Sequence, residues 1–282
     1  MVAIPIDDQD TVNQLTRRLR ARVEPILGLV FQAPEARAGG LGLNPIQWYM
    51  AGRAAPMGAI APLTAASLFA PLNPRFVERG LAGAWDRVTP EQIIDARLAS
   101  AAAMLEPIAD ACSAPLAQIN DLLQPIATVS PITGAPLYAG LLALPWPTSP
   151  FSVLLRCCDL IREHRGDMHN LAWLATGLDP AQINVLSELW KNAALGSVTV
   201  KQMGFSKGDA ERALHQLEHI GLAHDGVITP AGMTLRDSIE LETSLLQTTL
   251  ARRLEPCSDQ IFDLLTPISQ RCHDMVVAYW DR

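Results

Sequence analysis

The sequence predicts an all-α protein in which an N-terminal helical bundle precedes a winged-helix-like part with a very short β wing. Hydrophobic residues make up 49% of the 282 residues and aromatic residues only 5%, a balance typical of helices packed through small side chains. Asn44-Pro45, Thr89-Pro90 and Asp179-Pro180 each place a proline directly after a capping residue, and this pair marks the start of a helix.

The spacing of the apolar residues and these start signals predict where the helices of the first half of the chain lie. An amphipathic helix is expected over residues 10–32, and a second helix opens at Asn44. Thr89 opens a long Ala-rich helix to about residue 112. Short helices joined by turns are expected over residues 118–150, and a long helix follows over 151–176.

Residues 179–254 show the order of helices and strands that is typical of a winged helix. A helix to residue 192, a short second helix around 198–203 and a third helix from Ser206 to 220 are expected. Two short strands then flank the turn at Asp225-Gly226, and Thr229-Pro230 starts a long helix to about residue 254. The stretch E-R-A-L-H-Q-L-E-H-I-G-L, followed by I-T-P-A-G-M-T-L-R, resembles the recognition helix, wing and following helix of MarR-type winged-helix regulators.

This pattern divides the chain into four parts. We expect a helical N-terminal domain over residues 1–150, a connecting helix over 151–178, the winged-helix-like domain over 179–254, and a C-terminal helix over 255–282 that packs back on the bundle.

The charge of the chain argues against an ordinary DNA-binding surface. The formal net charge is −7, and residues 179–254 hold seven Lys and Arg against nine Asp and Glu. Because duplex DNA is a polyanion, any contact would have to come from a local basic patch. The sequence leaves two interpretations open, a winged helix that binds DNA and one that serves only as a packing scaffold.

Cysteine usage and hydropathy favour a cytoplasmic protein. Five cysteines without C-x-x-C spacing are typical of reduced core thiols. Neither a signal peptide nor an apolar run long enough for a transmembrane helix is found.

Two arginines share helical faces with apolar residues and are the strongest indication of a site. Arg165 follows Leu154 and Ile161 on one face, and Arg53 recurs with Tyr49 and Met57 on another. A buried guanidinium requires a carboxylate, carbonyl groups or a bound anion. We therefore expect Arg53, Arg165, Tyr49 and Glu35 to bind an anionic small molecule.

Acid and base groups lie beside Arg165. His164, Asp167 and His169 are the candidate catalytic residues, and the two histidines are expected to titrate near neutrality. The first hypothesis is thus a small-molecule-binding protein, as a cofactor-independent enzyme of the elimination, cyclisation or hydrolysis type. The alternative is a MarR-type transcriptional regulator that binds DNA and a small ligand. A homodimer or hetero-oligomer is a further expectation, and nucleic acid is the less favoured partner.

Simpler interpretations stand beside each of these. Arg53 and Arg165 also fit buried ion pairs with Glu35 and Asp167 that fix helix packing. His164 and His169 lack the i, i+4 spacing that chelates a metal best, so no metal site is predicted. Cys157-Cys158 fits the core better than a nucleophile. The nucleotide, dinucleotide, serine-hydrolase and zinc-protease motifs are absent, and no cofactor is predicted.

A second resemblance covers most of the chain. The runs R-C-C-D-L-I-R-E-H-R-G-D-M-H and W-Y-M-A-G-R-A-A-P-M-G resemble those of a family of actinobacterial helical proteins with a degenerate MarR-like winged helix-turn-helix half. The Ala-, Pro- and Arg-rich composition also resembles that of actinobacterial proteins, which implies specialised metabolism as a context.

Overall fold

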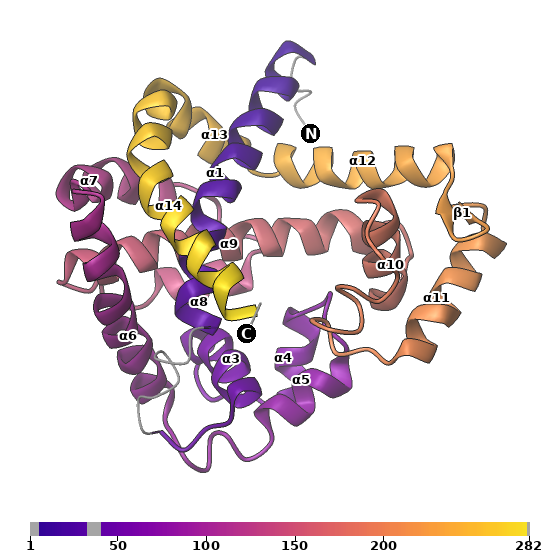
Figure 1. Cartoon of the computed structure of the whole chain (residues 1–282), viewed down its shortest axis with the longest axis horizontal. Helices are drawn as coiled ribbons and strands as arrows, with labels where there is room; N and C mark the ends of the chain where they lie inside the picture. The colour runs from indigo at the N-terminus through magenta and orange to yellow at the C-terminus, as the bar shows by residue number, and fades with distance from the viewer. Residues whose placement is uncertain (1–5, 33–40, 281–282) are drawn as a thin grey trace. The chain divides into compact units, whose positions relative to one another are not determined.

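A computed structural model describes residues 6–32 and 41–280, and it confirms the all-α fold with a very short β wing (Figure 1). The chain forms two compact units. Unit 1 consists of Met1–Ile60, Gly83–Asp167 and Ser244–Arg282, and unit 2 of Ala61–Ala82 and Met168–Thr243. Unit 2 therefore includes a segment that is remote in sequence from its winged-helix part.

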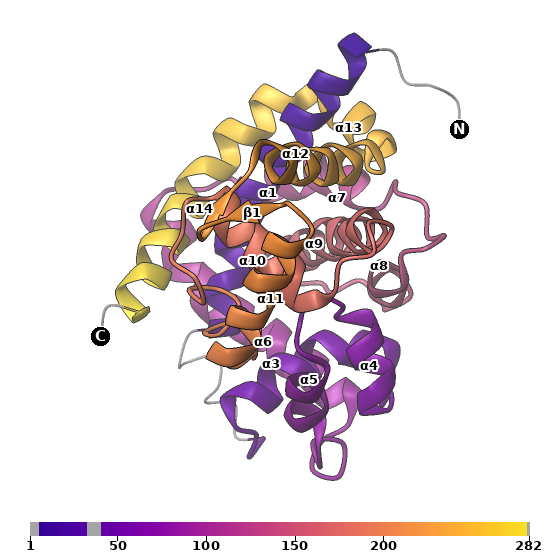
Figure 2. The ribbon, with the colours of Figure 1, turned by 90° about the vertical axis from the view of Figure 1, so that its right-hand side faces the viewer.

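The regular elements among the described residues of unit 1 are all helices. Its elements are α1 (Ile6–Gln32), α3 (Pro45–Ala54), η1 (Ala55–Met57), α6 (Pro90–Ala111), α7 (Leu116–Ala127), α8 (Pro136–Leu142), most of α9 (Pro150–Leu174), α13 (Thr248–Leu254), η2 (Glu255–Cys257) and α14 (Ser258–Trp280). Both ribbon views show α14 beside α1 (Figures 1 and 2). Val23, Ile26 and Leu265 are among the fully buried side chains of these two helices, so their contact forms much of the core.

Capping fixes the helix starts as the sequence predicts. Asn44 and Thr89 begin α3 and α6, and Asp179 and Ser206 begin the corresponding helices of unit 2. Each of the four forms a capping box, in which its side chain and that of the third helical residue bond reciprocally to free backbone N–H groups.

Unit 2 contains the winged helix. Its elements are α4 (Pro62–Leu68), α5 (Pro74–Leu81), the end of α9, α10 (Pro180–Trp190), α11 (Lys207–His219), β1 (Ala223–His224), β2 (Val227–Ile228) and most of α12 (Pro230–Leu245). Trp173, Val185 and Leu217 bring α9, α10 and α11 into one buried apolar cluster. The two strands pair antiparallel, with Ala223 opposite Ile228.

Hydrogen bonds join α4 and α5 to the rest of unit 2. The side-chain amide of Asn184 on α10 donates to the carbonyl of Pro71 at 2.7 Å. The backbone N–H of Asn73 donates to Met203 at 2.9 Å, directly before α11. This segment is therefore part of the winged-helix unit.

Two predicted helices differ from those observed. The short helix expected around residues 198–203 is a series of turns. The helix expected from residue 230 to 254 is interrupted after Leu245, and α13 begins at Thr248. Among the described residues, none of the helices has an apolar stretch of the length that a membrane span needs.

Candidate functional site

Glu163 on α9 anchors a buried polar cluster in unit 1. Arg53 donates to both of its carboxylate oxygens, at 3.1 and 2.8 Å, and Arg162 donates to one of them at 2.5 Å. Burial by itself raises the pKa of this carboxyl, but the two guanidinium groups outweigh it and lower the pKa to about 2. Two cations therefore share one carboxylate.

A second pair lies deeper in the same unit. Arg97 on α6 donates to Asp159 at 2.9 Å, and its guanidinium carbon lies 4.3 Å from the ring centroid of Phe31. Sequence reasoning missed Arg97, although it shares a helical face with the buried Ile93 and Ala101 and thus carries the same signal as Arg53.

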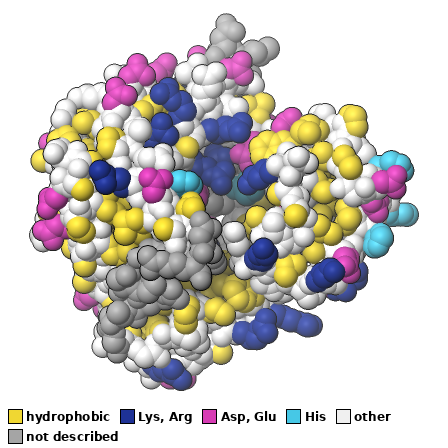
Figure 3. Space-filling model, viewed as in Figure 1, with side chains coloured by type: hydrophobic (Ala, Val, Ile, Leu, Met, Phe, Trp, Pro, Cys, Tyr) yellow, Lys and Arg dark blue, Asp and Glu magenta, His cyan; other side chains and the backbone are white. Residues whose placement is uncertain are grey.

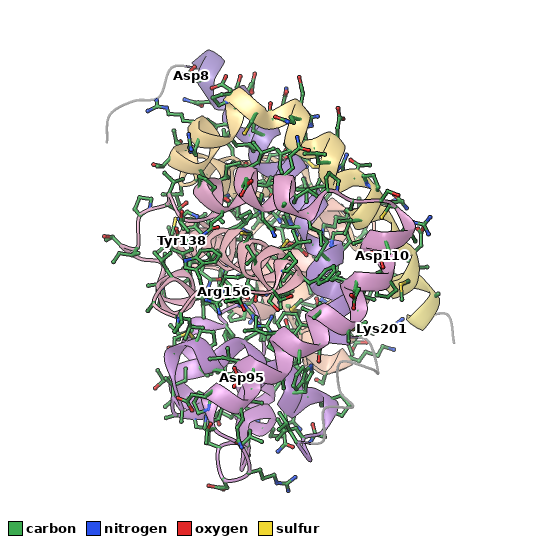
Figure 4. The ribbon with its side chains drawn as sticks, turned by 90° about the vertical axis from the view of Figure 1, so that its left-hand side faces the viewer. Asp8, Asp95, Asp110, Tyr138, Arg156 and Lys201 are labelled. Atoms are coloured by element: carbon green, nitrogen blue, oxygen red, sulfur yellow. The ribbon has the colours of Figure 1, made fainter. Side chains whose placement is uncertain are left out.

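Arg165 is buried, as its position on the apolar face predicts, with 6% of its surface exposed. Arg156 is equally buried and donates to the carbonyls of Leu141 and Pro145. Burial lowers the pKa of Arg156, in spite of the nearby carboxylate of Asp159. Arg156 on α9 and Tyr138 on α8 are both labelled in Figure 4.

Tyr138 contacts two of the predicted catalytic residues, His164 and Asp167. Its ring centroid lies 5.0 Å from that of His164, and its backbone N–H donates to Asp167 at 3.0 Å. Burial raises the pKa of Asp167 to about 7 and lowers that of His164 to about 4. The expected titration near neutrality is therefore wrong for His164, and Asp167 is the group that titrates there.

The other predicted site residues are dispersed. Tyr49 lies beside Arg53, whose guanidinium carbon is 5.8 Å from its ring centroid. His169 belongs to unit 2, where its Nδ1 lies 3.0 Å from the hydroxyl of Thr243. Glu35 lies outside the described residues. The binding and catalytic roles assigned to these residues stay predictions.

The cysteine pair is buried. Burial raises the pKa of Cys157 to about 12 and that of Cys158 well above its ordinary value, so both are protonated thiols at neutral pH. Within the part of the chain that the structure describes, no three His, Cys, Asp or Glu side chains are grouped to hold a metal ion.

In unit 2, a buried carboxylate shapes the turn between α10 and α11. Glu188, which is 1% exposed, accepts the backbone N–H groups of Gly196, Val198 and Thr199 at 2.6 to 2.8 Å. The β-branched run Val198-Thr199-Val200 has low helix propensity. Glu188 therefore holds a compact turn where the sequence predicts a short helix.

Helix α11 buries one face and presents the other to solvent. Ala210, Ala213 and Leu217 pack inward, whereas Lys207, Glu211, Arg212, His215 and His219 are exposed. Lys207 pairs with Glu211 at 3.7 Å, and Arg212 pairs with Asp209. Exposed pairs of this kind contribute little to stability, so their cations remain free to change partners.

Helix α5 adds positive charge that is not included in the count of charged residues over 179–254. Arg75 and Arg79 on α5 are exposed, and Arg75 lies close enough to Asp209 to contribute to lowering the pKa of that carboxyl, after the larger effects of Ser206 and Arg212. Figure 3 shows Lys and Arg side chains over α5 and the start of α11, and others elsewhere on this face. We call Arg75, Lys207 and Arg212 the basic cluster.

In contrast to the basic cluster, the wing and the end of α11 carry acidic and histidine side chains. The backbone angle φ is +48° at Asp225 and +74° at Gly226, as a tight hairpin turn requires. Glu218 accepts the backbone N–H of Gly226 at 3.0 Å and so ties this turn to α11. Histidine and acidic side chains crowd this edge of unit 2 in Figure 3.

A helix, a turn, an exposed helix and a two-stranded wing together define a winged helix-turn-helix protein. Residues 16–278 match the Helix-turn-helix family, and the chain belongs to this family. No match was found among curated proteins or among solved structures.

Proposed function

We propose that this chain is a transcriptional regulator of the MarR type, which binds duplex DNA by placing α11 in the major groove. The observation that carries the proposal is the basic cluster at the start of an exposed α11 in a helix-turn-helix protein. In this class of protein, the first residues of the recognition helix approach the base edges.

The N-terminal end of α11 suits a polyanion for two reasons. Backbone N–H groups at a helix start carry partial positive charge, which attracts phosphate. Arg75 comes from outside the helix, and a phosphate contact made by such a side chain would orient α11 in the groove. Since the whole chain carries a net charge of −7, binding should be weak and strongly dependent on salt.

The proposal is tested by measuring the affinity of the full chain for a random duplex as a function of salt, using fluorescence anisotropy. The double variant Lys207→Ala/Arg212→Ala should bind about tenfold more weakly, and its salt slope should fall by about two, one for each lost phosphate contact. Gel filtration and circular dichroism would verify that the variant is folded.

A matched control removes the same charge elsewhere. Arg252 and Arg253 are exposed on α13 in unit 1, and Arg252→Ala/Arg253→Ala should leave affinity and salt slope unchanged. If the wild-type chain does not bind duplex at low salt, or if both double variants lose affinity equally, the proposal is wrong.

A further inference from the structure

We infer that Arg212 on α11 reads guanine in the major groove, so that the preferred duplex contains a G·C pair opposite the first turn of this helix. The inference rests on the proposed function, since it concerns the same DNA-binding helix. Three observations carry it: the face on which Arg212 lies, the glycine beside its guanidinium group, and the fixed carboxylate that this group contacts.

Arg212 lies on the outer face of α11. The buried residues Ala210, Ala213 and Leu217 define the inner face of the helix. Gly208 and Arg212, which are four residues apart, lie on the opposite face, where the side chain of Arg212 is 69% exposed. A recognition helix turns its exposed face to the major groove, so Arg212 is positioned to reach base edges.

Gly208 leaves the helix surface open beside Arg212. Its φ is negative, so the backbone does not require glycine there, and glycine lowers the helix propensity of the segment. A Cβ atom placed on Gly208 would lie 3.5 Å from Nη1 of Arg212 and 3.9 Å from Oγ of Ser206, which are ordinary contacts. The chain itself therefore tolerates a methyl group at this position. A base pair that closely approaches the first turn accounts for the glycine.

A carboxylate that is itself held in place orients Arg212. One oxygen of Asp209 accepts hydrogen bonds from the backbone N–H and the hydroxyl of Ser206, at 2.8 and 2.6 Å, in the capping box of α11. Nη2 of Arg212 donates to the other oxygen. This bond keeps the guanidinium group over the first turn, and among the described residues no acceptor is found for its Nη1 and Nε. A side chain oriented in this way loses less conformational entropy when it binds.

The side chains of α11 favour G·C pairs. The O6 and N7 atoms of guanine accept two hydrogen bonds from one guanidinium group, whereas adenine is read by Asn or Gln. The only such residue of α11 is Gln216, whose side-chain oxygen accepts from Gln182 on α10 at 3.3 Å. On a duplex without a suitably placed guanine, Arg212 is instead attracted to phosphate, so it contributes to binding of a random duplex as well.

The inference is tested by selecting bound duplexes from a random library with the full chain and sequencing them. Guanine should be enriched at one position of the recovered motif, and Arg212→Ala should lose this enrichment. The matched control is Lys207→Ala, which removes a cation that is 88% exposed in the same turn. It should lower the affinity but keep the motif, because a phosphate contact acts uniformly across sequences.

A modified base tests which atom is read. Replacing the enriched guanine by 7-deazaguanine removes the N7 acceptor from the major groove and leaves Watson–Crick pairing intact. Binding of the wild type, measured by fluorescence anisotropy, should weaken at least about fivefold, whereas the affinity of Arg212→Ala should stay unchanged. Gly208→Ala should be at least as stable as the wild type in urea denaturation but should bind the motif at least about fivefold more weakly.

The outcomes separate this inference from the proposed function. A wild-type chain that binds no duplex of the library would overturn DNA binding itself. Binding without an enriched guanine, or an enrichment that persists in Arg212→Ala, would overturn the inference and leave DNA binding intact. Equal effects of 7-deazaguanine on the wild type and on Arg212→Ala would also overturn it. A Gly208→Ala variant that binds the motif as tightly as the wild type would refute the close approach at the first turn.

Discussion

The side-chain amide of Asn73 donates to the carbonyl of Gly204 at 3.0 Å and so connects α5 to the chain just before α11. Gly204 has a φ of +77°, and a Cβ atom placed there would lie 2.2 Å from Cγ of Phe76. Backbone geometry and the close approach of Phe76 thus both require glycine at this position. Through this contact α5 brings Arg75 to the start of α11.

Gly204→Ala should consequently destabilise unit 2. A methyl group would force Phe76 away and would strain a residue held at positive φ, at an expected cost of about 1–3 kcal/mol in the free energy of unfolding. Urea denaturation followed by tryptophan fluorescence measures this cost. Gly226→Ala is the control, since it is strained in φ but meets no atom within 4 Å. Equal losses in the two variants would contradict a role for the Phe76 contact.

Asp167 and His164 should give opposite slopes to the dependence of stability on pH. The pKa of Asp167 is about 7 in the folded chain, above its unfolded value near 4, so the folded state holds the extra proton and stability falls as pH rises from about 4 to 7. The pKa of His164 is about 4, below its unfolded value near 6.5. The unfolded state therefore holds that proton, and stability falls as pH drops from about 6.5 to 4.

Single variants separate the two slopes. Asp167→Asn should be more stable than the wild type above about pH 7, by a few kcal/mol, since Asn still accepts from the Tyr138 N–H without ionising. His164→Gln should keep only the decline in stability between about pH 4 and 7. Denaturant unfolding at a series of pH values measures both. A wild-type pH profile retained in Asp167→Asn would show that its carboxyl is ionised throughout.

Most of the fold could be predicted from the sequence because helix starts are local. Asn44, Thr89, Asp179 and Ser206 each form a capping box with the residue three positions on, so a short window contains the whole signal. The burial of Arg165 follows in the same way from spacing along one helix.

The features that the sequence did not predict depend on burial or on contacts between residues that are distant in the chain. Glu188 replaces a predicted helix with a turn because its carboxylate is buried next to that backbone. Glu163, which the structure shows on Arg53, lies 110 residues away from it in the chain. Likewise, Arg75 adds positive charge near the start of α11, but it lies outside residues 179–254 and is therefore missing from a charge count over that segment.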